Sequence, residues 1–301
     1  MPPLSFIVFE ISVYVLAVLY LRRATLHSRR VVVTLLAGML YGVLLEYATI
    51  LSYQAYTYGR FLVMIFGTVP LCIGVSWGII IYTAMETSDR LQLPWFIRPL
   101  LDALLALTID LSMDAIAIRL GFWTWGADGA WFGVPLGNFY GWFGVVVSFA
   151  FLLRLGHWWC TAIPGGWLRD LAVPLLAVPL SIVVLLQLLT LYSFLISHGV
   201  SAWLIIGSIL AASVVVPLGF ARRARCDNPL DGGVIAGPLF FHVFFSGALV
   251  WAEIYREVPM LAVVSLGMFV LGILLHLWPS WKWLRADGRE HATQQVSETV
   301  R

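Results

Sequence analysis

Long apolar segments recur along this 301-residue chain, and they constrain its fold more than any other feature. Each has about 17 to 25 mostly apolar residues, which is enough to cross a hydrocarbon layer about 30 Å thick as a helix. The composition agrees, because 61% of the residues are hydrophobic and only 11% are charged. An outer-membrane barrel would instead show alternating segments of about ten residues. The sequence therefore predicts an integral membrane protein built from helices.

We predict an all-α bundle of about nine transmembrane spans, at residues 4–21, 31–51, 61–85, 100–119, 137–153, 171–196, 203–221, 234–254 and 259–278. When the connections alternate between two sides of the membrane, only Arg60, Arg119 and Arg256 of the 18 lysines and arginines fall on one side. Basic residues accumulate on the cytoplasmic side, so we expect the N-terminus outside and the C-terminus in the cytoplasm. Residues 1–284 are expected to form one transmembrane domain, and residues 285–301 a polar cytoplasmic tail.

Several classes of function lack support in the composition and motifs. A net charge of +2 gives no sign of a nucleic-acid partner. The three cysteines, Cys72, Cys160 and Cys226, lie far apart and form no metal or disulfide motif. The six histidines do not cluster, and neither a glycine-rich dinucleotide motif nor a Walker loop occurs. These absences leave acid–base chemistry without a metal or cofactor, or transport.

Two carboxylates interrupt the apolar span 100–119. Asp110 and Asp114 are four residues apart, so they share one face of a helix. An ionised aspartate at the centre of a span costs roughly 2.5 to 3.5 kcal/mol on insertion scales, and we therefore expect at least one of the pair to be protonated. Glu46 is a third acid, near the outer end of its span, whereas Glu10 is expected to reach for lipid headgroups. The alternative for Asp110 and Asp114 is that they only hydrogen-bond within the bundle, and the alternative for Glu46 is that it also reaches for lipid headgroups.

Aromatic residues gather near the same predicted outer side. A tryptophan-rich stretch, G-F-W-T-W, follows the two aspartates, and S-Y-Q-A-Y-T-Y-G follows Glu46. Indole rings can line a pocket and stabilise a cation, although tryptophan at a membrane interface is often only an anchor. The topology predicts that the three acids share one outer pocket with Tyr56, Tyr58, Trp123, Trp125 and Asn138. Trp142 is a further candidate for substrate binding.

The motifs from Asp110 to Phe143 resemble a family of carotenoid-biosynthesis membrane proteins that includes carotenoid 1,2-hydratases and archaeal bisanhydrobacterioruberin hydratase. The matching features are D-L-S-M-D, G-F-W-T-W and W-F-G-V-P-L-G-N-F-Y-G-W-F, with E-Y-A-T and V-P-L-C-I-G-V-S-W upstream. The resemblance covers roughly Leu35 to Leu153. This sequence departs from the family pattern at Ala115, where proline is common, and in S-Y-Q-A, where a glycine-rich stretch is usual.

The resemblance implies an enzyme that adds water to the terminal double bond of an acyclic carotenoid end group, without a cofactor. Asp114 would then donate the proton, Asp110 would tune or reprotonate it, and Glu46 would orient or deprotonate the water. The aromatic residues of the outer pocket would wall the cationic end group. The implied partners are the lipid bilayer, a hydrophobic polyene and other enzymes of the carotenoid pathway, and the implied location is the plasma membrane of a prokaryote.

Three other interpretations stay open at this stage. A carotenoid or isoprenoid cyclase would use the same acid chemistry and trap the cation with an internal double bond. A proton-coupled transporter would use the three acids as a proton relay. A non-catalytic subunit would use them only to hold the bundle together.

Overall fold

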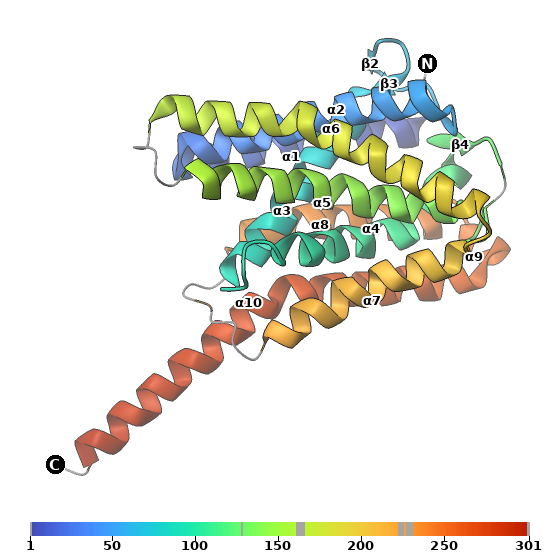
Figure 1. The fold of residues 1–301 in the computed structure, drawn as a ribbon. Coiled ribbons are helices and arrows are strands. Elements are labelled where there is room, and N and C mark those ends of the chain that lie inside the picture. Colours follow the sequence, from blue (N-terminus) through green and yellow to red (C-terminus); the bar gives the residue numbers. More distant parts are fainter. Residues whose placement is uncertain (1, 128, 161–165, 222–225, 227–230, 300–301) are drawn as a thin grey trace.

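A computed structural model of the chain describes residues 2–127, 129–160, 166–221, 226 and 231–299, and it is an all-α bundle, as predicted. Figure 1 shows the long helices lying side by side. The helices are α1 (Leu4–His27), α2 (Arg29–Tyr53), α3 (Leu71–Arg90), α4 (Arg98–Leu120), α5 (Leu136–Trp159), α6 (Trp167–Ser197), α7 (Ala202–Ala221), α8 (Gly232–Trp251), α9 (Ile254–Glu257) and α10 (Pro259–Thr299). The strands are β1 (Tyr56–Tyr58), β2 (Met64–Ile65), β3 (Val69–Pro70) and β4 (Trp123–Trp125).

Each of the nine predicted spans corresponds to one long helix. Eight helices in the described part of the chain are long and apolar enough to cross a membrane, namely α1, α2, α3, α5, α6, α7, α8 and α10. The remaining one, α4, has a comparable length of 23 residues. Its aspartates lower its hydropathy, but they are buried inside the bundle, where Asp110 is 0% and Asp114 is 2% exposed. Helix α4 is therefore a central helix whose polar residues face protein.

The predicted start of the third span, at residue 61, is wrong. The segment before α3 forms the short β2–β3 hairpin, in which Phe66 and Gly67 have positive φ angles of 51° and 70°. Glu10, which we expected at the headgroups, is fully buried and accepts hydrogen bonds from the backbone N–H groups of Leu62 at 2.6 Å and Val63 at 2.9 Å. The positive φ angles at Phe66 and Gly67 interrupt a helix, and Pro70 directly precedes the first helical residue, so α3 begins only at Leu71.

Helices α2 and α3 approach closely because glycines face each other across their interface. A Cβ atom added to Gly42 would lie 2.3 Å from the carbonyl oxygen of Gly74 and 2.6 Å from Cβ of Trp77. One turn away, a Cβ atom on Gly38 would lie 3.3 Å from Cα of Gly78. Small residues at such positions let two membrane helices pack backbone to backbone. Glu46 follows Gly42 by about one turn on α2, so this contact brings its carboxyl group against α3.

The arginine-rich ends of the helices meet at one end of the bundle. Arg23 near the end of α1 pairs with Asp231 before α8 at 2.9 Å. At the opposite end, Arg119 of α4 lies 3.9 Å from Glu257 of α9. Among the described residues, this grouping agrees with the charge asymmetry on which the predicted topology rests. The N-terminus outside and the C-terminus in the cytoplasm stay predictions.

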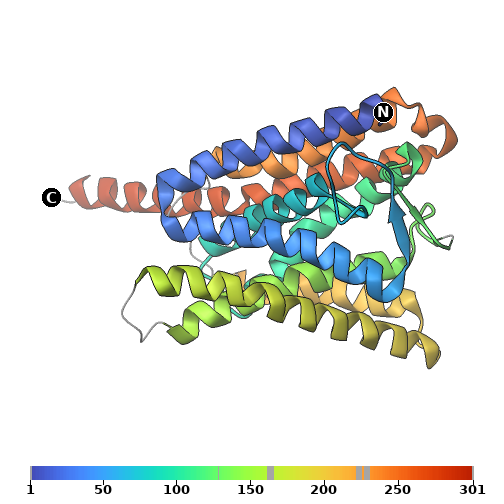
Figure 2. The same ribbon diagram turned by 90° about the horizontal axis from the view of Figure 1, so that it is seen from above.

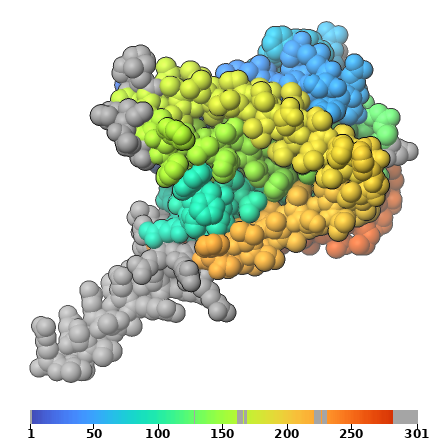
Figure 3. Space-filling model, viewed as in Figure 1, coloured from blue at the N-terminus to red at the C-terminus, as the bar shows by residue number. Residues whose placement is uncertain are grey.

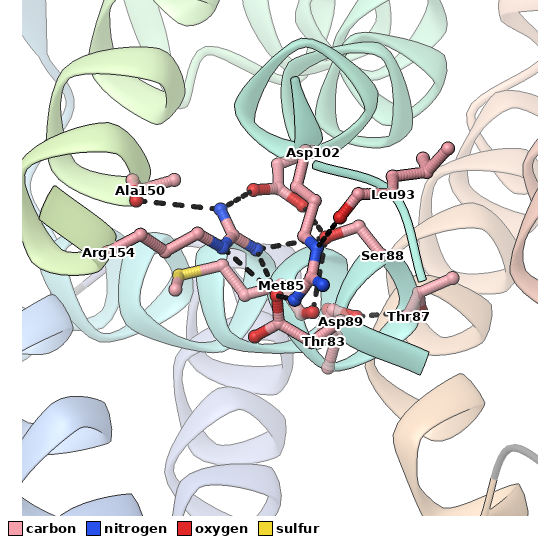
Figure 4. A network of polar contacts seen from close by, with 10 residues as sticks. Thr83, Met85, Thr87, Ser88, Asp89, Leu93, Asp102, Ala150 and Arg154 are labelled. Atoms are coloured by element: carbon pink, nitrogen blue, oxygen red, sulfur yellow. Dashed lines mark hydrogen bonds and ion pairs between the residues drawn. The ribbon is translucent and has the colours of Figure 1, made fainter. Parts of the chain in front are cut away.

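A buried ionic cluster ties α3, α4 and α5 together at the arginine-rich end (Figure 4). Arg154 of α5 is 7% exposed and contacts the carboxylate of Asp102 at 2.5 Å and that of Asp89 at 2.9 Å. Ser88 donates to Asp102 at 2.5 Å and accepts from Arg154 at 2.9 Å. Because each charge has a partner, the cluster fixes the ends of three helices.

The last helix is longer than its predicted span. Helix α10 begins at Pro259 and continues to Thr299, so the predicted boundary between residues 284 and 285 falls within it. Residues 300–301 of the predicted tail lie outside the described part. Figure 1 shows the final turns of α10 extending beyond the other helices.

Candidate functional site

Two connections that are far apart in sequence pair beyond the C-terminal ends of α2 and α4. Strand β1 pairs with strand β4 in antiparallel register, so that Tyr56 lies opposite Trp125 and Tyr58 opposite Trp123. Thr57 of β1 is exposed, and its hydroxyl contacts that of Thr124 of β4 at 3.0 Å. Side chains alternate between the two faces of a strand, so the four aromatic residues share the opposite face, toward the bundle.

A cavity of about 570 Å³ lies beneath this ribbon. Its lining comes from helices α1, α2, α3, α4, α5, α6 and α8 as well as from both strands. All six residues predicted to bind substrate line it, namely Tyr56, Tyr58, Trp123, Trp125, Asn138 and Trp142. Two of the three predicted catalytic acids, Glu46 and Asp114, also line it, whereas Asp110 is not among its lining residues.

Glu46 is held by donors on both carboxylate oxygens. The indole N–H of Trp77 donates to Oε1 at 2.7 Å, and the hydroxyl of Tyr56 donates to Oε2 at 2.5 Å. The Tyr58 hydroxyl lies beside the same carboxyl group. Glu46 is 4% exposed. These donors on both oxygens hold the Glu46 carboxyl group in one orientation within the cavity.

The two tyrosines of β1 keep their protons. Burial raises the pKa values of Tyr56 and Tyr58 well above the ordinary value for tyrosine. The neighbouring Glu46 carboxylate raises both pKa values further. Both hydroxyl groups therefore stay protonated at neutral pH. The Tyr56 hydroxyl also forms a hydrogen bond with the Thr49 hydroxyl at 2.9 Å. Thr49 of α2 therefore positions the hydroxyl that donates to Glu46.

Asp114 presents an unpaired oxygen within the same cavity. Its Oδ2 atom is buried and has no hydrogen-bond partner among the described residues. Trp123 lies beside the Asp114 carboxyl group, and Glu46 is close enough to interact with it electrostatically. An unpaired buried carboxyl oxygen is costly unless a ligand, a water molecule or a proton occupies it. Asp114 is therefore the acid in this cavity whose oxygen is free to meet a substrate.

Asp110 reaches the cavity only through another residue. Its carboxylate accepts from the side-chain amide of Asn138, with distances of 3.1 and 3.2 Å to the two oxygens. Asn138 lies in the first turn of α5 and itself lines the cavity. Asp110 is thus placed to orient Asn138 and to interact with the neighbouring Asp114.

Aromatic rings surround the two cavity acids. Trp77 and Trp142 pack with ring centroids 4.2 Å apart. In the ribbon above them, Tyr56 and Trp125 are 5.0 Å apart, and the Trp125 Nε1 atom is buried without a partner among the described residues. Such ring faces carry partial negative charge and stabilise a nearby cation by about 0.5 to 2 kcal/mol each.

Several lining residues escaped the sequence prediction. Ser76 of α3 lines the cavity with a buried hydroxyl that lacks a partner in the described part of the chain. Phe241 of α8 and the α6 residues Leu189 and Tyr192 line it as well. A serine, a phenylalanine or a leucine in an apolar span carries no signal of its own, because such residues are common throughout membrane helices. Helices α6 and α8 thus complete the site as well as the bundle.

The described residues offer no grouped metal ligands. Among them, no three His, Cys, Asp or Glu side chains gather closely enough to hold a metal ion.

The comparison with protein families agrees with the motifs and extends them. A family model described as carotenoid biosynthesis protein matches residues 3–210, about two thirds of the chain. The match includes both cavity acids, both strands of the ribbon and helix α6. Comparison with curated proteins and with solved structures gave no match. From the family match, this integral membrane chain belongs to the carotenoid biosynthesis protein family.

Proposed function

We propose that the protein adds water to the terminal isoprenoid double bond of an acyclic carotenoid end group, producing a tertiary alcohol. The observation that carries this proposal is the pairing of two unlike acids in one aromatic cavity. Asp114 has an unpaired carboxyl oxygen, whereas the carboxylate of Glu46 is held by Trp77 and Tyr56. Neighbouring carboxyl groups with different surroundings are suited to separate acid and base roles.

Asp114 supplies the proton in this mechanism. Two neighbouring carboxyl groups away from bulk water do not both ionise readily, and Glu46 has the donors that stabilise a charge. The proton of Asp114 adds to the less substituted carbon of the terminal double bond, and the π electrons form the new C–H bond. The more substituted carbon becomes a tertiary cation, and Asp114 becomes a carboxylate.

The cavity then stabilises the cation until water traps it. The negative charges of Asp114 and Glu46 and the faces of Trp77 and Trp142 surround the cationic carbon. A water molecule held by polar groups such as Ser76 and Asn138 donates a lone pair to form the C–O bond. The extra proton on the new oxygen passes to Glu46 and returns to Asp114. One alkene and one water thus give one alcohol, and the protein is unchanged.

The test is to express the protein in a host that accumulates lycopene or another acyclic carotenoid, and to analyse the pigments by chromatography with mass detection. We expect a product heavier by one water for each hydrated end, and oxygen-18 from labelled water in that product. Asp114→Asn should abolish the product. Glu253→Gln is a matched control, because Glu253 is an exposed acid paired with Arg256 far from the cavity.

The same experiment separates the competing functions. A product of unchanged mass that carries no oxygen-18 would identify a cyclase. Unchanged pigment with several acyclic carotenoids would contradict the hydratase proposal, and proton uptake by vesicles containing the protein would then support a transporter.

A further inference from the structure

We infer that the polyene reaches the cavity sideways from the membrane, through the seam between the outer halves of α2 and α6, and that Tyr53 acts as the latch of this seam. The inference rests on the proposed function, because it takes the ligand to be a long hydrocarbon chain with a reactive end. Such a chain dissolves in the bilayer and not in water, so it needs a path that leaves its remaining length in lipid.

One layer of helices separates the cavity from the surroundings along this seam. Helices α2 and α6 run side by side in Figures 1 and 2. Thr49 of α2 and Leu185 and Leu189 of α6 line the cavity from within. On the outer faces of the same stretches, Leu51 is 60% exposed and Val183 is 57% exposed. These two helices therefore contact the cavity on one side and present apolar side chains outward on the other.

The cavity reaches the surface where the seam ends. Most of its lining is buried or half-buried, but several lining residues near the outer end are exposed, namely Tyr53, Gln54, Ala55, Gly126, Ala127 and Ser193. They come from the end of α2, from the segments beside the β1–β4 ribbon and from α6. Figure 3 shows the near face of the bundle, where α6 lies against the end of α2. The exposed rim thus lies at the junction of these two helices.

Tyr53 bridges the seam. Its hydroxyl donates to the backbone carbonyl of Leu186 at 3.1 Å and contacts the hydroxyl of Thr190 at 3.0 Å. Its ring lines the cavity and is also exposed. A hydrogen bond at such a surface position contributes only about 0.5 to 1.5 kcal/mol. This contact can therefore open and close without unfolding either helix.

Helix α6 is suited to move at its outer half. Pro174 and Pro179 lie inside it, and each removes one N–H donor from the helical ladder. Beyond them, Tyr192 packs over a glycine of α5, since a Cβ atom on Gly137 would lie 3.0 Å from the Tyr192 ring. Proline positions are where helices bend. The outer half of α6 can therefore bend away from α2 while Tyr192 keeps its contact with α5.

A reversible cross-link provides the test. In a protein whose native cysteines are replaced by alanine, Tyr53→Cys and Thr190→Cys place one thiol on each side of the seam for a cleavable bifunctional reagent. The matched control is Leu176→Cys with Leu180→Cys, two exposed residues one turn apart on α6, which cross-links one exposed face of α6 to itself. Polyene uptake from vesicles is followed by quenching of tryptophan fluorescence, because Trp77, Trp123, Trp125 and Trp142 line the cavity.

We expect the cross-link across the seam to slow uptake strongly, because the polyene can no longer part the two helices, and cleavage to restore it. The control cross-link should leave uptake unchanged. Tyr53→Phe, which keeps the ring and loses the hydroxyl, should speed uptake by about two- to tenfold, the equivalent of one surface hydrogen bond. Unchanged uptake in the cross-linked seam would overturn the inference.

The readout also separates this inference from the proposed function. Uptake reports binding and does not require hydration. If the wild-type protein takes up the polyene through the seam but forms no water adduct, the proposed function is wrong and the inferred entry through the seam is supported. If the adduct forms at the same rate with the seam cross-linked, the inferred entry through the seam is wrong and the hydratase function is supported.

Discussion

Asn138 donates its side-chain amide to the Asp110 carboxylate, at 3.1 and 3.2 Å from the two oxygens, and only Asn138 of this pair lines the cavity. Asp110 is therefore expected to act by positioning. Asp110→Asn should lower kcat by about tenfold, the value of one hydrogen bond to a charged group. Asp114→Asn should lower it by about 10² to 10⁴, as expected for loss of a general acid. Steady-state rates with an acyclic carotenoid measure both.

A double-mutant cycle checks this difference. If Asp110 acts through Asn138, then Asp110→Asn combined with Asn138→Leu should be no worse than Asn138→Leu alone. Fully multiplicative losses would show that Asp110 acts on the substrate or on Asp114 independently.

The donors to Glu46 should contribute to the rate without determining the product. Tyr56→Phe removes the hydroxyl that contacts Oε2 at 2.5 Å and keeps the ring. A hydrogen bond to a charged group is worth about 1.5 to 3 kcal/mol, so we expect kcat to fall by about 10- to 100-fold with the same hydrated product. Thr57→Val changes the exposed face of the same strand and serves as the control. Equal effects of the two substitutions would argue for a merely structural role of β1.

The glycine contact between α2 and α3 should be sensitive to one methyl group. Gly42→Ala places a Cβ atom 2.3 Å from the Gly74 carbonyl oxygen, so the two helices must separate. Overpacking of this kind costs about 1 to 3 kcal/mol, and Glu46 would also shift from Trp77. Thermal unfolding in detergent measures the first effect and activity the second. Gly247→Ala is the control, because nothing lies within 4 Å of its added Cβ atom.

The buried ionic cluster should matter far more than an exposed ion pair. Asp102→Asn leaves Arg154 without its most buried partner, and breaking a buried pair from one side costs about 3 to 5 kcal/mol. The exposed pair of Arg256 with Glu253 is the comparison, and Glu253→Gln should cost about 1 kcal/mol or less. The unfolding midpoints of the two variants show which substitution destabilises the protein more. A smaller loss for Asp102→Asn than for Glu253→Gln would contradict the assigned role of the cluster.

Asp231 predicts a dependence of stability on pH. The backbone N–H of Gly233 and the guanidinium of Arg23 hold the pKa of Asp231 below its ordinary value. A lowered pKa in the folded state stabilises the fold above the unfolded-state pKa, about 3.9 for aspartate. This stabilisation is lost as pH falls through the lower, folded-state pKa. The unfolding temperatures of wild type and Asp231→Asn should therefore differ at neutral pH and converge once the pH falls below the folded-state pKa of Asp231. A difference that grows on acidification would contradict this sign.

The sequence by itself determined the class of fold and part of the cavity lining, including both of its acids. Apolar segments report burial in lipid directly, because every backbone polar group in a membrane must be satisfied within a helix. The motif spacing also predicted an outer pocket around Glu46 and Asp114. It could not place the start of α3, because residues 61–70 are as apolar as a span. The backbone beside the hairpin there is held by the buried Glu10 of α1, a contact between distant segments.

Only the tertiary structure decided which acids meet the cavity. Asp110 and Asp114 look equivalent in sequence, one helical turn apart, yet one bonds Asn138 and the other keeps an unpaired oxygen beneath Trp123. The pairing of β1 with β4, and the place of α6 along the seam with Tyr53, depend on contacts between segments far apart in the chain. Local hydropathy carries no information about such contacts, because they follow from glycine packing and hydrogen bonds between different helices.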